Sequence, residues 1–235
     1  NSDLADTTMA KGGIFKNITT DEPLGYVRVY GNLVGSLGFT TEGEAISEVD
    51  FSNLINSKDR QGNKVARRHK VHAIDLTFSA PKTVSIAGLV LKENHVVLYH
   101  QIAVRETMKE IEKIAGSANL GQGRTAHTGK LIWAEVQDGY SREKDPHLHT
   151  HCIVMNITET NGRYYALDGK KILRSDFNKV FGAIYRQKLA AHLARDMGLK
   201  VSYIKNGEWR LDKISTNCEK GFSTRRSQIL EAQSK

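Results

Sequence analysis

Two hydrophobic patterns alternate along the chain, one typical of strands and one typical of helices. Four segments alternate apolar and polar positions or are rich in β-branched residues, which predicts strands over residues 71–79, 130–138, 147–158 and 163–167. Residues 93–115 and 175–197 repeat their apolar positions at helical spacing, and each segment ends at a glycine, Gly116 or Gly198. Hairpins combined with separate helices favour an α+β fold.

Shorter elements are expected between these segments. Residues 50–56 predict a short helix with Asp50 or Ser52 as its cap. Another helix begins after the strand over 71–79, with Ser79 as a candidate cap and a proline in its first turn. The glycines within residues 116–128 predict a loop.

The two ends of the chain differ from its middle. Residues 1–25 are polar and show little periodicity, so we expect a mobile arm or loop, followed by one domain over residues 26–235. Residues 200–204 and 209–211 predict a last hairpin, and the basic tail predicts a helix near residues 225–232.

Composition narrows the class of protein. Apolar residues make up 39% and charged residues 26% of the chain, which is typical of a globular protein. No apolar run approaches the roughly 20 residues that a membrane-spanning helix needs, and no signal peptide is visible, so membrane insertion is not expected. Cys152 and Cys218 are too few for a disulfide scaffold, which favours the cytoplasm.

The net charge raises the question of a partner. The chain has 34 Lys and Arg against 26 Asp and Glu, a formal charge of +8. A basic balance of this size fits either an ordinary solvated surface or a polyanionic partner, of which nucleic acid is the commonest.

Three histidines form the densest chemical signal. Side chains two residues apart on a strand share a face, so His147, His149 and His151 are expected to point the same way. Two neighbours at about 7 Å can converge on one divalent ion, whereas three in a row span about 13 Å. Asp138, at the end of the preceding predicted strand, is the candidate third ligand. The alternative is an ordinary polar strand face.

Other candidates are an acid and four basic residues. Asp75 lies among apolar residues of a predicted strand, where it either makes a structural hydrogen bond or serves as an acid, base or orienting group. Lys82 lies in a predicted helix start, which attracts phosphate. Arg67, Arg68 and Arg142 lie in polar segments and are candidate DNA contacts, with a solvated surface as the alternative.

Two long motifs carry a family resemblance. Residues 72–84 read HAIDLTFSAPKTV and residues 141–151 read SREKDPHLHTH. Together they resemble the relaxase domain of MobF-type conjugative relaxases, which belong to the HUH endonucleases, and a weaker likeness extends over about residues 31–222. The resemblance implies a two-layer fold with helices packed on a central antiparallel sheet and the histidine motif on central strands.

The resemblance also implies an activity. Such enzymes nick and rejoin one DNA strand at an origin of transfer, with metal assistance and through a 5′-phosphotyrosyl intermediate, and so initiate conjugative transfer. The expected partners are single-stranded DNA of that origin and the other relaxosome and secretion-coupling proteins, in the bacterial cytoplasm. Asp75 matches the family's acidic residue that orients or activates the tyrosine or a ligand histidine. A replication-initiation HUH nuclease is a further alternative.

The metal ligands depart from the family pattern. His149 and His151 match two of the three family histidines, and the third position is occupied by Asp138. Either Asp138 is the third ligand, or His147 takes its place, or the site is weak. An oxygen ligand favours Mn²⁺ or Mg²⁺ over Zn²⁺, Ni²⁺ or Fe²⁺.

The nucleophile is the larger departure. Family tyrosines lie near the N-terminus, often in pairs, whereas Tyr26 and Tyr30 are the first tyrosines here and are unpaired. Three readings stay open: the tyrosine precedes Asn1, which the missing initiator Met favours; Tyr26 serves; or the domain is a non-catalytic module that binds single-stranded DNA.

Overall fold

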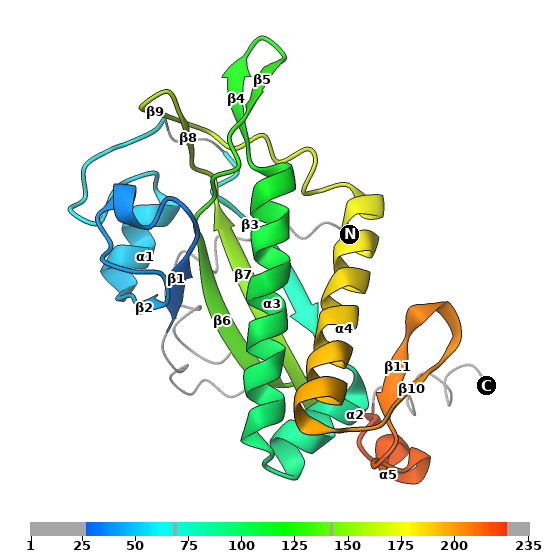
Figure 1. Ribbon diagram of the computed structural model, residues 1–235. Coiled ribbons are helices and arrows are strands. Elements are labelled where there is room, and N and C mark those ends of the chain that lie inside the picture. The colour runs from blue at the N-terminus through cyan, green and yellow to red at the C-terminus, as the bar shows by residue number, and fades with distance from the viewer. Residues whose placement is uncertain (1–26, 68–69, 142, 225–235) are drawn as a thin grey trace, which may run out of the picture. The chain divides into compact units, whose positions relative to one another are not determined.

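The computed structural model describes residues 27–67, 70–141 and 143–224 (Figure 1). The expected arm over residues 1–25 and the expected tail helix lie outside the described residues, as do Tyr26, Arg68 and Arg142.

A five-stranded sheet is the largest element, with strand order β2-β1-β6-β7-β3. The strands are β1 (Arg28–Tyr30), β2 (Glu44–Ala45), β3 (Ala73–Ser79), β6 (Trp133–Tyr140) and β7 (Pro146–Met155). β1 pairs antiparallel with both β2 and β6, with Arg28 opposite Ala45 on one side and Glu135 on the other. A short linker joins β6 to its neighbour β7, as in the predicted hairpin. The predicted α+β class is confirmed.

The two long helices agree with their predictions. α3 spans Asn94–Ala115 and α4 spans Ser175–Met197. Their buried stripes follow helical spacing. On α3 the stripe includes Val96, Val104, Met108 and Ile111, and on α4 it includes Phe181, Tyr185, Leu189 and Leu193.

The described residues divide into two compact units. The first comprises the residues up to Thr77 together with Thr107–Gln137 and His151–Phe181. The second comprises Phe78–Glu106, Asp138–Thr150 and the residues from Gly182 onward.

Apolar residues of β1, of the segment between β1 and β2, of α1, and in or next to β6 and β7 form the core of the first unit. Its fully buried members include Val29, Leu37, Leu54, Ile132, Ala134 and Met155. α1 (Glu48–Ile55) lies beside β1 and β2 (Figure 1). Its cap is Ser47, which forms a capping box with Asp50, so the predicted caps Asp50 and Ser52 were wrong. Asp50 is the third helical residue, whose carboxylate bonds back to the Ser47 N–H.

One further prediction for the first unit was wrong. Residues 116–128 do not form only a loop, because β4 (Ser117–Gly121) and β5 (Arg124–His127) pair as an antiparallel hairpin. Left-handed backbone at Gly121, Gln122 and Gly123 makes the tight turn. The strands are short and mostly exposed, and their apolar residues are only Ala118, Leu120 and Ala126, so the apolar signal that predicts strands is weak. β8 (Thr158–Thr160) and β9 (Arg163–Tyr165) form another hairpin of this unit.

The second unit contains most of the short elements. They are α2 (Lys82–Ser85), a π-helical turn (Ile86–Val90), β10 (Val201–Tyr203), β11 (Trp209–Leu211) and α5 (Thr216–Gly221). β10 and β11 form the predicted hairpin. Ser79 does not cap α2, because it ends β3 and Pro81 precedes the first helical residue.

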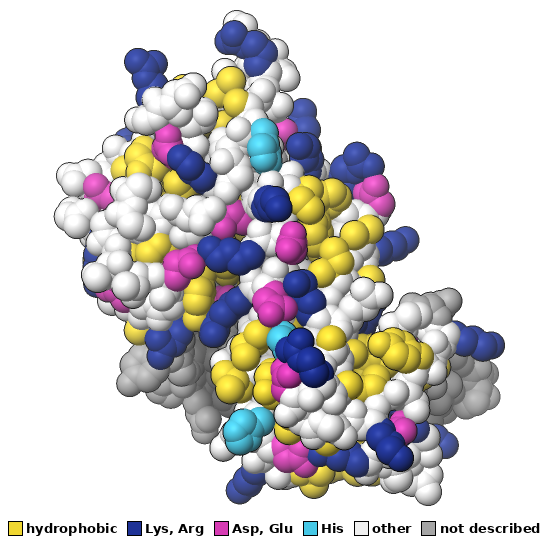
Figure 2. Space-filling model, in the orientation of Figure 1, with side chains coloured by type: hydrophobic (Ala, Val, Ile, Leu, Met, Phe, Trp, Pro, Cys, Tyr) yellow, Lys and Arg dark blue, Asp and Glu magenta, His cyan; other side chains and the backbone are white. Residues whose placement is uncertain are grey.

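Two predicted strand boundaries also change. β6 continues to Tyr140, so Asp138 lies within the strand rather than at its end. The segment 147–158 divides into β7 and the start of β8. In the described residues, no helix combines the length and apolar composition needed to cross a bilayer. On the face in Figure 2, Lys and Arg side chains are interspersed with Asp and Glu.

Candidate functional site

The side chains of β7 alternate between two environments. Those of His147, His149 and His151 are half-buried, whereas those of the intervening Leu148 and Thr150 are buried, as is Cys152. The three histidines therefore share the more open face of the strand, as the sequence predicts.

In the first unit, the side chain of His151 is hydrogen-bonded to a carboxylate. Its Nδ1 lies 2.8 Å from Oδ2 of Asp75 on β3, the sheet neighbour of β7. Thr77 completes the group, with its hydroxyl donating to Oδ1 of Asp75 at 3.4 Å and lying 3.2 Å from Nδ1 of His151. The Asp75 and His151 side chains are only 17% and 19% exposed, so water competes weakly for this hydrogen bond. The Asp75 carboxylate is thus placed where it can orient the imidazole of His151.

In the second unit, His149 is bound to the backbone of its own strand. Its Nδ1 lies 2.7 Å from the carbonyl oxygen of His147. The rings of His147 and His149 lie 4.8 Å apart, centroid to centroid, and are tilted by 42°. A carbonyl oxygen only accepts hydrogen bonds, so Nδ1 of His149 carries the proton.

The two hydrogen bonds have the same chemical consequence. A neutral imidazole whose proton is on Nδ1 has its lone pair on Nε2, which is the atom that can bind a metal. Metal-binding histidines commonly donate their other N–H to a carboxylate or a backbone carbonyl. His151 has the first kind of partner and His149 has the second, so the chemistry of both fits a divalent cation.

Asp138 supplies a buried carboxylate in the second unit. It is 7% exposed, and its Oδ1 accepts the backbone N–H of Tyr140 at 3.1 Å. Within residues 27–67, 70–141 and 143–224, no three His, Cys, Asp or Glu side chains form a preassembled group of metal-site dimensions.

Sequence and structure comparisons place the chain in a family. The profile of the TrwC relaxase family matches residues 22–235. The chain belongs to the TrwC relaxase family. Two curated relatives, both multifunctional conjugation proteins TraI, come from Escherichia coli and from its strain K12. They are 27% and 30% identical over 97% and 77% of this relaxase-family chain, which spans only 14% and 11% of their lengths.

Solved structures of TrwC are similar over nearly the whole chain. TrwC complexed with a 27-mer DNA comprising the recognition hairpin and the cleavage site is 28% identical, with a TM-score of 0.81 over 98% of this chain and 80% of that one. A metal-bound TrwC–OriT DNA complex is 31% identical, with a TM-score of 0.77 over 89% of this chain and 73% of that one. The predicted relaxase-type fold is therefore confirmed.

The basic candidates of this relaxase-family chain differ in their surroundings. Arg67 is exposed. Lys82 is half-buried in the second unit, where its Nζ donates to the carbonyl oxygen of Pro146 at 3.0 Å. Burial lowers the pKa of Lys82, while the nearby carboxylates of Asp145 and Glu219 act to raise it. Arg68 and Arg142 lie outside the described residues.

Sequence reasoning missed two hydrogen-bonded groups of the second unit. The carboxylate of Asp145, just before β7, accepts the N–H and the hydroxyl of Thr224 at 2.8 and 3.0 Å. His100 of α3 lies buried between Thr150 and Tyr185. Its place in the apolar stripe of α3 was the available signal, because a buried histidine needs polar partners.

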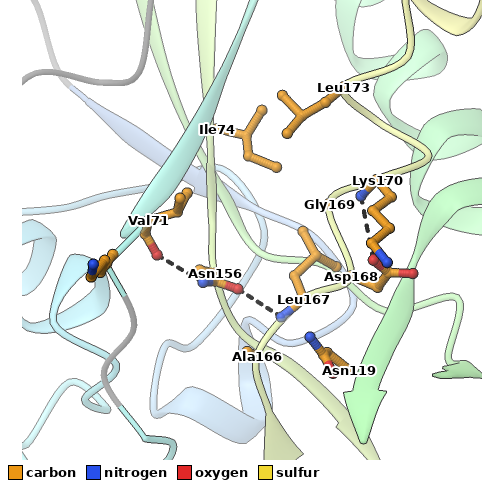
Figure 3. A pocket seen from close by; sticks show the side chains of 11 residues that line it. Val71, Ile74, Asn119, Asn156, Ala166, Leu167, Asp168, Gly169, Lys170 and Leu173 are labelled. Carbon is orange, nitrogen blue, oxygen red and sulfur yellow. Dashed lines mark hydrogen bonds between the residues drawn. The ribbon is translucent and has the colours of Figure 1, made fainter. Parts of the chain in front are cut away.

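A separate cavity lies in the first unit. Its volume is about 430 Å³, and Asn156 holds two of its walls together by donating to the carbonyl oxygen of Val71 and accepting the N–H of Leu167, both at 2.7 Å (Figure 3). None of the predicted site residues that the structure describes lines this cavity.

Proposed function

We propose that this chain nicks and rejoins one strand of single-stranded DNA at an origin of transfer, in the bacterial cytoplasm, and so initiates conjugative transfer. The observation that carries the proposal is the pair of hydrogen bonds on β7, from Nδ1 of His149 to the His147 carbonyl oxygen and from Nδ1 of His151 to the Asp75 carboxylate, because histidines that bind a metal through Nε2 commonly make such bonds. The TrwC and TraI relatives act in conjugation by their names, which supports the same role here.

We propose that His149, His151 and Asp138 hold a divalent ion. Metal-bound TrwC supports a metal in this family, and one of its structures contains copper. The carboxylate of Asp138 favours Mn²⁺ or Mg²⁺ over Zn²⁺, Ni²⁺ or Fe²⁺. When bound, such an ion polarises the non-bridging oxygens of the scissile phosphate and stabilises the charge of its transition state.

Asp75 has a positioning role in this proposal. Its carboxylate accepts the Nδ1 proton of His151, so it fixes both the tautomer and the ring direction. A carboxylate already committed to a histidine is a poor base for a tyrosine, which favours orientation of the ligand over activation of the nucleophile.

We propose Tyr26, the first tyrosine of the chain, as the nucleophile within these residues. Its hydroxyl oxygen forms a bond to the scissile phosphorus as the bond from phosphorus to the 3′ oxygen breaks. The tyrosine proton is lost and the 3′ oxygen gains one, which leaves a 5′-phosphotyrosyl enzyme and a free 3′-OH. The reverse step rejoins the strand.

Four basic residues are the proposed phosphate contacts. Arg67, Arg68 and Arg142 belong to polar segments, and Arg67 is exposed. The ammonium group of Lys82 has three N–H donors, of which the carbonyl oxygen of Pro146 takes one. The remaining two can meet a phosphate oxygen. Relaxosome and secretion-coupling proteins are the further partners we propose.

A covalent-adduct assay tests the proposal. The chain is incubated with a labelled single-stranded oriT oligonucleotide and Mn²⁺, and the products are separated under denaturing conditions. We expect an adduct that His149→Ala abolishes and that His147→Ala, on the same strand face, largely retains. Loss of the adduct in Tyr26→Phe supports Tyr26. DNA binding without any adduct would instead assign this chain to the class of non-catalytic binding modules.

A further inference from the structure

A buried hydrogen-bonded cluster of the second unit lies on the closed side of β7. His100 of α3 is 0% exposed, Tyr185 of α4 is 1% exposed and Thr150 of β7 is 2% exposed. The Nδ1 of His100 lies 2.6 Å from the Tyr185 hydroxyl, and its Nε2 lies 2.8 Å from Oγ1 of Thr150. Both ring nitrogens are therefore partnered, and the proposed reaction uses neither of them.

The neutral state of His100 allows both of its ring nitrogens to be hydrogen-bonded. Burial, and to a smaller extent the neighbouring His149, lower the pKa of His100 to about 3, so the imidazole is neutral near pH 7. In a neutral imidazole one nitrogen donates and the other accepts. Each hydroxyl can take either role, so every polar atom of the ring is satisfied whichever nitrogen carries the proton.

Thr150 connects this cluster to the histidine face. It stands between His149 and His151 in the sequence and its side chain points away from theirs. The β-branched threonine side chain is stiff, so holding its Oγ1 also restrains the backbone from which both histidines project. A second anchor acts two residues earlier, where the Leu148 N–H donates to the Ser85 hydroxyl at 3.0 Å and the Ala80 N–H donates to the Leu148 carbonyl oxygen at 2.9 Å.

Tyr185 fixes the far end of the cluster. Its ring meets the His100 ring edge-on, with centroids 5.7 Å apart, and packs against Phe78 at 5.4 Å. The hydroxyl that holds His100 is thus itself held by the packing of its ring.

We propose that His100, Thr150 and Tyr185 are positioning residues that restrain β7 from its buried face. This restraint keeps the Nδ1–H of His149 hydrogen-bonded to the His147 carbonyl oxygen and directs Nε2 of His149 toward the metal. This inference rests on the proposed function, because it assigns His149 as a ligand. The three side chains are buried behind the histidine face, so we expect them to affect the affinity and geometry of the metal site and not the chemistry of cleavage.

The test compares two buried threonines of the same unit. Thr150→Val and Tyr185→Phe each remove one hydroxyl of the cluster, and Thr150→Ser restores the first. Thr83→Val is the matched control, because the buried Thr83 hydroxyl accepts the Leu211 N–H at 3.0 Å on a different element. Mn²⁺ affinity is measured by calorimetry. We expect Thr150→Val to weaken Mn²⁺ binding about tenfold, which is the low end of the range for groups that orient metal ligands. Thr150→Ser should recover the affinity, and Thr83→Val should leave the affinity unchanged.

A metal-free measurement separates this inference from the proposed function. Long-range ¹H–¹⁵N spectra report which nitrogen of His149 is protonated, and we expect the Nδ1–H form in the wild-type chain and a mixture of forms in Thr150→Val. If the wild-type chain binds no Mn²⁺, the proposed function fails and this spectrum still decides the positioning role. The positioning role would be overturned if Thr150→Val and Tyr185→Phe gave the same His149 spectrum as the Thr83→Val control.

Discussion

His151 in the first unit and His149 in the second obtain the same tautomer from different partners. The Nδ1 proton of His151 is directed to the carboxylate of Asp75, 2.8 Å away, whereas that of His149 is directed to a backbone carbonyl 2.7 Å away. A carboxylate brings a negative charge, which makes the imidazole a more basic ligand, while a carbonyl brings only a dipole. One partner can be removed by mutation and the other cannot.

The difference indicates where each histidine is vulnerable. The orientation of His151 depends on a single side chain, Asp75, with Thr77 as a weaker third member. The orientation of His149 depends on the path of β7, which the buried side chains behind it support. The following predictions test this contrast, beginning with the largest expected effect.

Removal of either of the proposed metal ligands, His149 or His151, should have the largest effect. His149→Ala and His151→Ala should each reduce Mn²⁺ affinity by more than about 100-fold, the upper range for groups that only support a ligand. Isothermal titration calorimetry measures this loss. His147→Ala is the control, and a loss as large in that variant would show that His147 is a ligand instead.

Removal of Asp75 should have the next largest effect. Asp75→Ala should weaken Mn²⁺ binding about 10- to 100-fold, because His151 then loses the partner that selects its tautomer. Asp75→Asn should lose less, since its amide oxygen still accepts the Nδ1 proton. Calorimetry and the adduct assay are run together. If Asp75→Ala keeps normal metal affinity but loses cleavage, Asp75 acts on the tyrosine nucleophile rather than on His151.

Much of this contrast between His149 and His151 could not be predicted from local sequence patterns. The alternation in residues 147–151 places the histidines on one face, because a strand has a period of two. The partner of His151 depends on β3 lying next to β7, and strand order is a long-range property. The cluster around His100 likewise joins three elements distant in the chain. The helix over residues 175–197 was predictable because its apolar stripe and its final glycine are both local, whereas the polar β4–β5 hairpin offered no local pattern.

The neutral state of the buried His100 should make the stability of the chain depend on pH. The pKa of His100 is lowered to about 3 in the folded chain from an ordinary value near 6.5, so between these values the unfolded chain binds one more proton. Stability therefore rises with pH across this window and falls on acidification, by up to about 1.4 kcal/mol per pH unit from this group. Urea unfolding at pH 7, 6 and 5 should give a flatter profile for His100→Gln than for the wild-type chain.

An exposed histidine provides the control for this pH dependence. His95 also lies on α3 but is exposed, so His95→Gln should keep the wild-type slope. Equal slopes for His100→Gln and the wild-type chain would mean that His100 is protonated in the folded state, contrary to a neutral buried cluster.

Thr77 should give the smallest effect. Its hydroxyl is exposed and its contacts with Asp75 and His151, at 3.4 and 3.2 Å, are near the upper limit for hydrogen bonds. Thr77→Val should reduce Mn²⁺ affinity less than about threefold, below the range for a principal orienting group. A larger loss than in Asp75→Ala would reverse the order of importance assigned to these two residues.

The most direct test of the account is anomalous diffraction at the manganese edge from crystals grown with Mn²⁺. We predict one strong peak, which marks a manganese ion bonded to Nε2 of His149, Nε2 of His151 and a carboxylate oxygen of Asp138. Both Nδ1 atoms should still be directed at their oxygen partners. A peak bonded through Nδ1, or one located away from these two histidines, would contradict it.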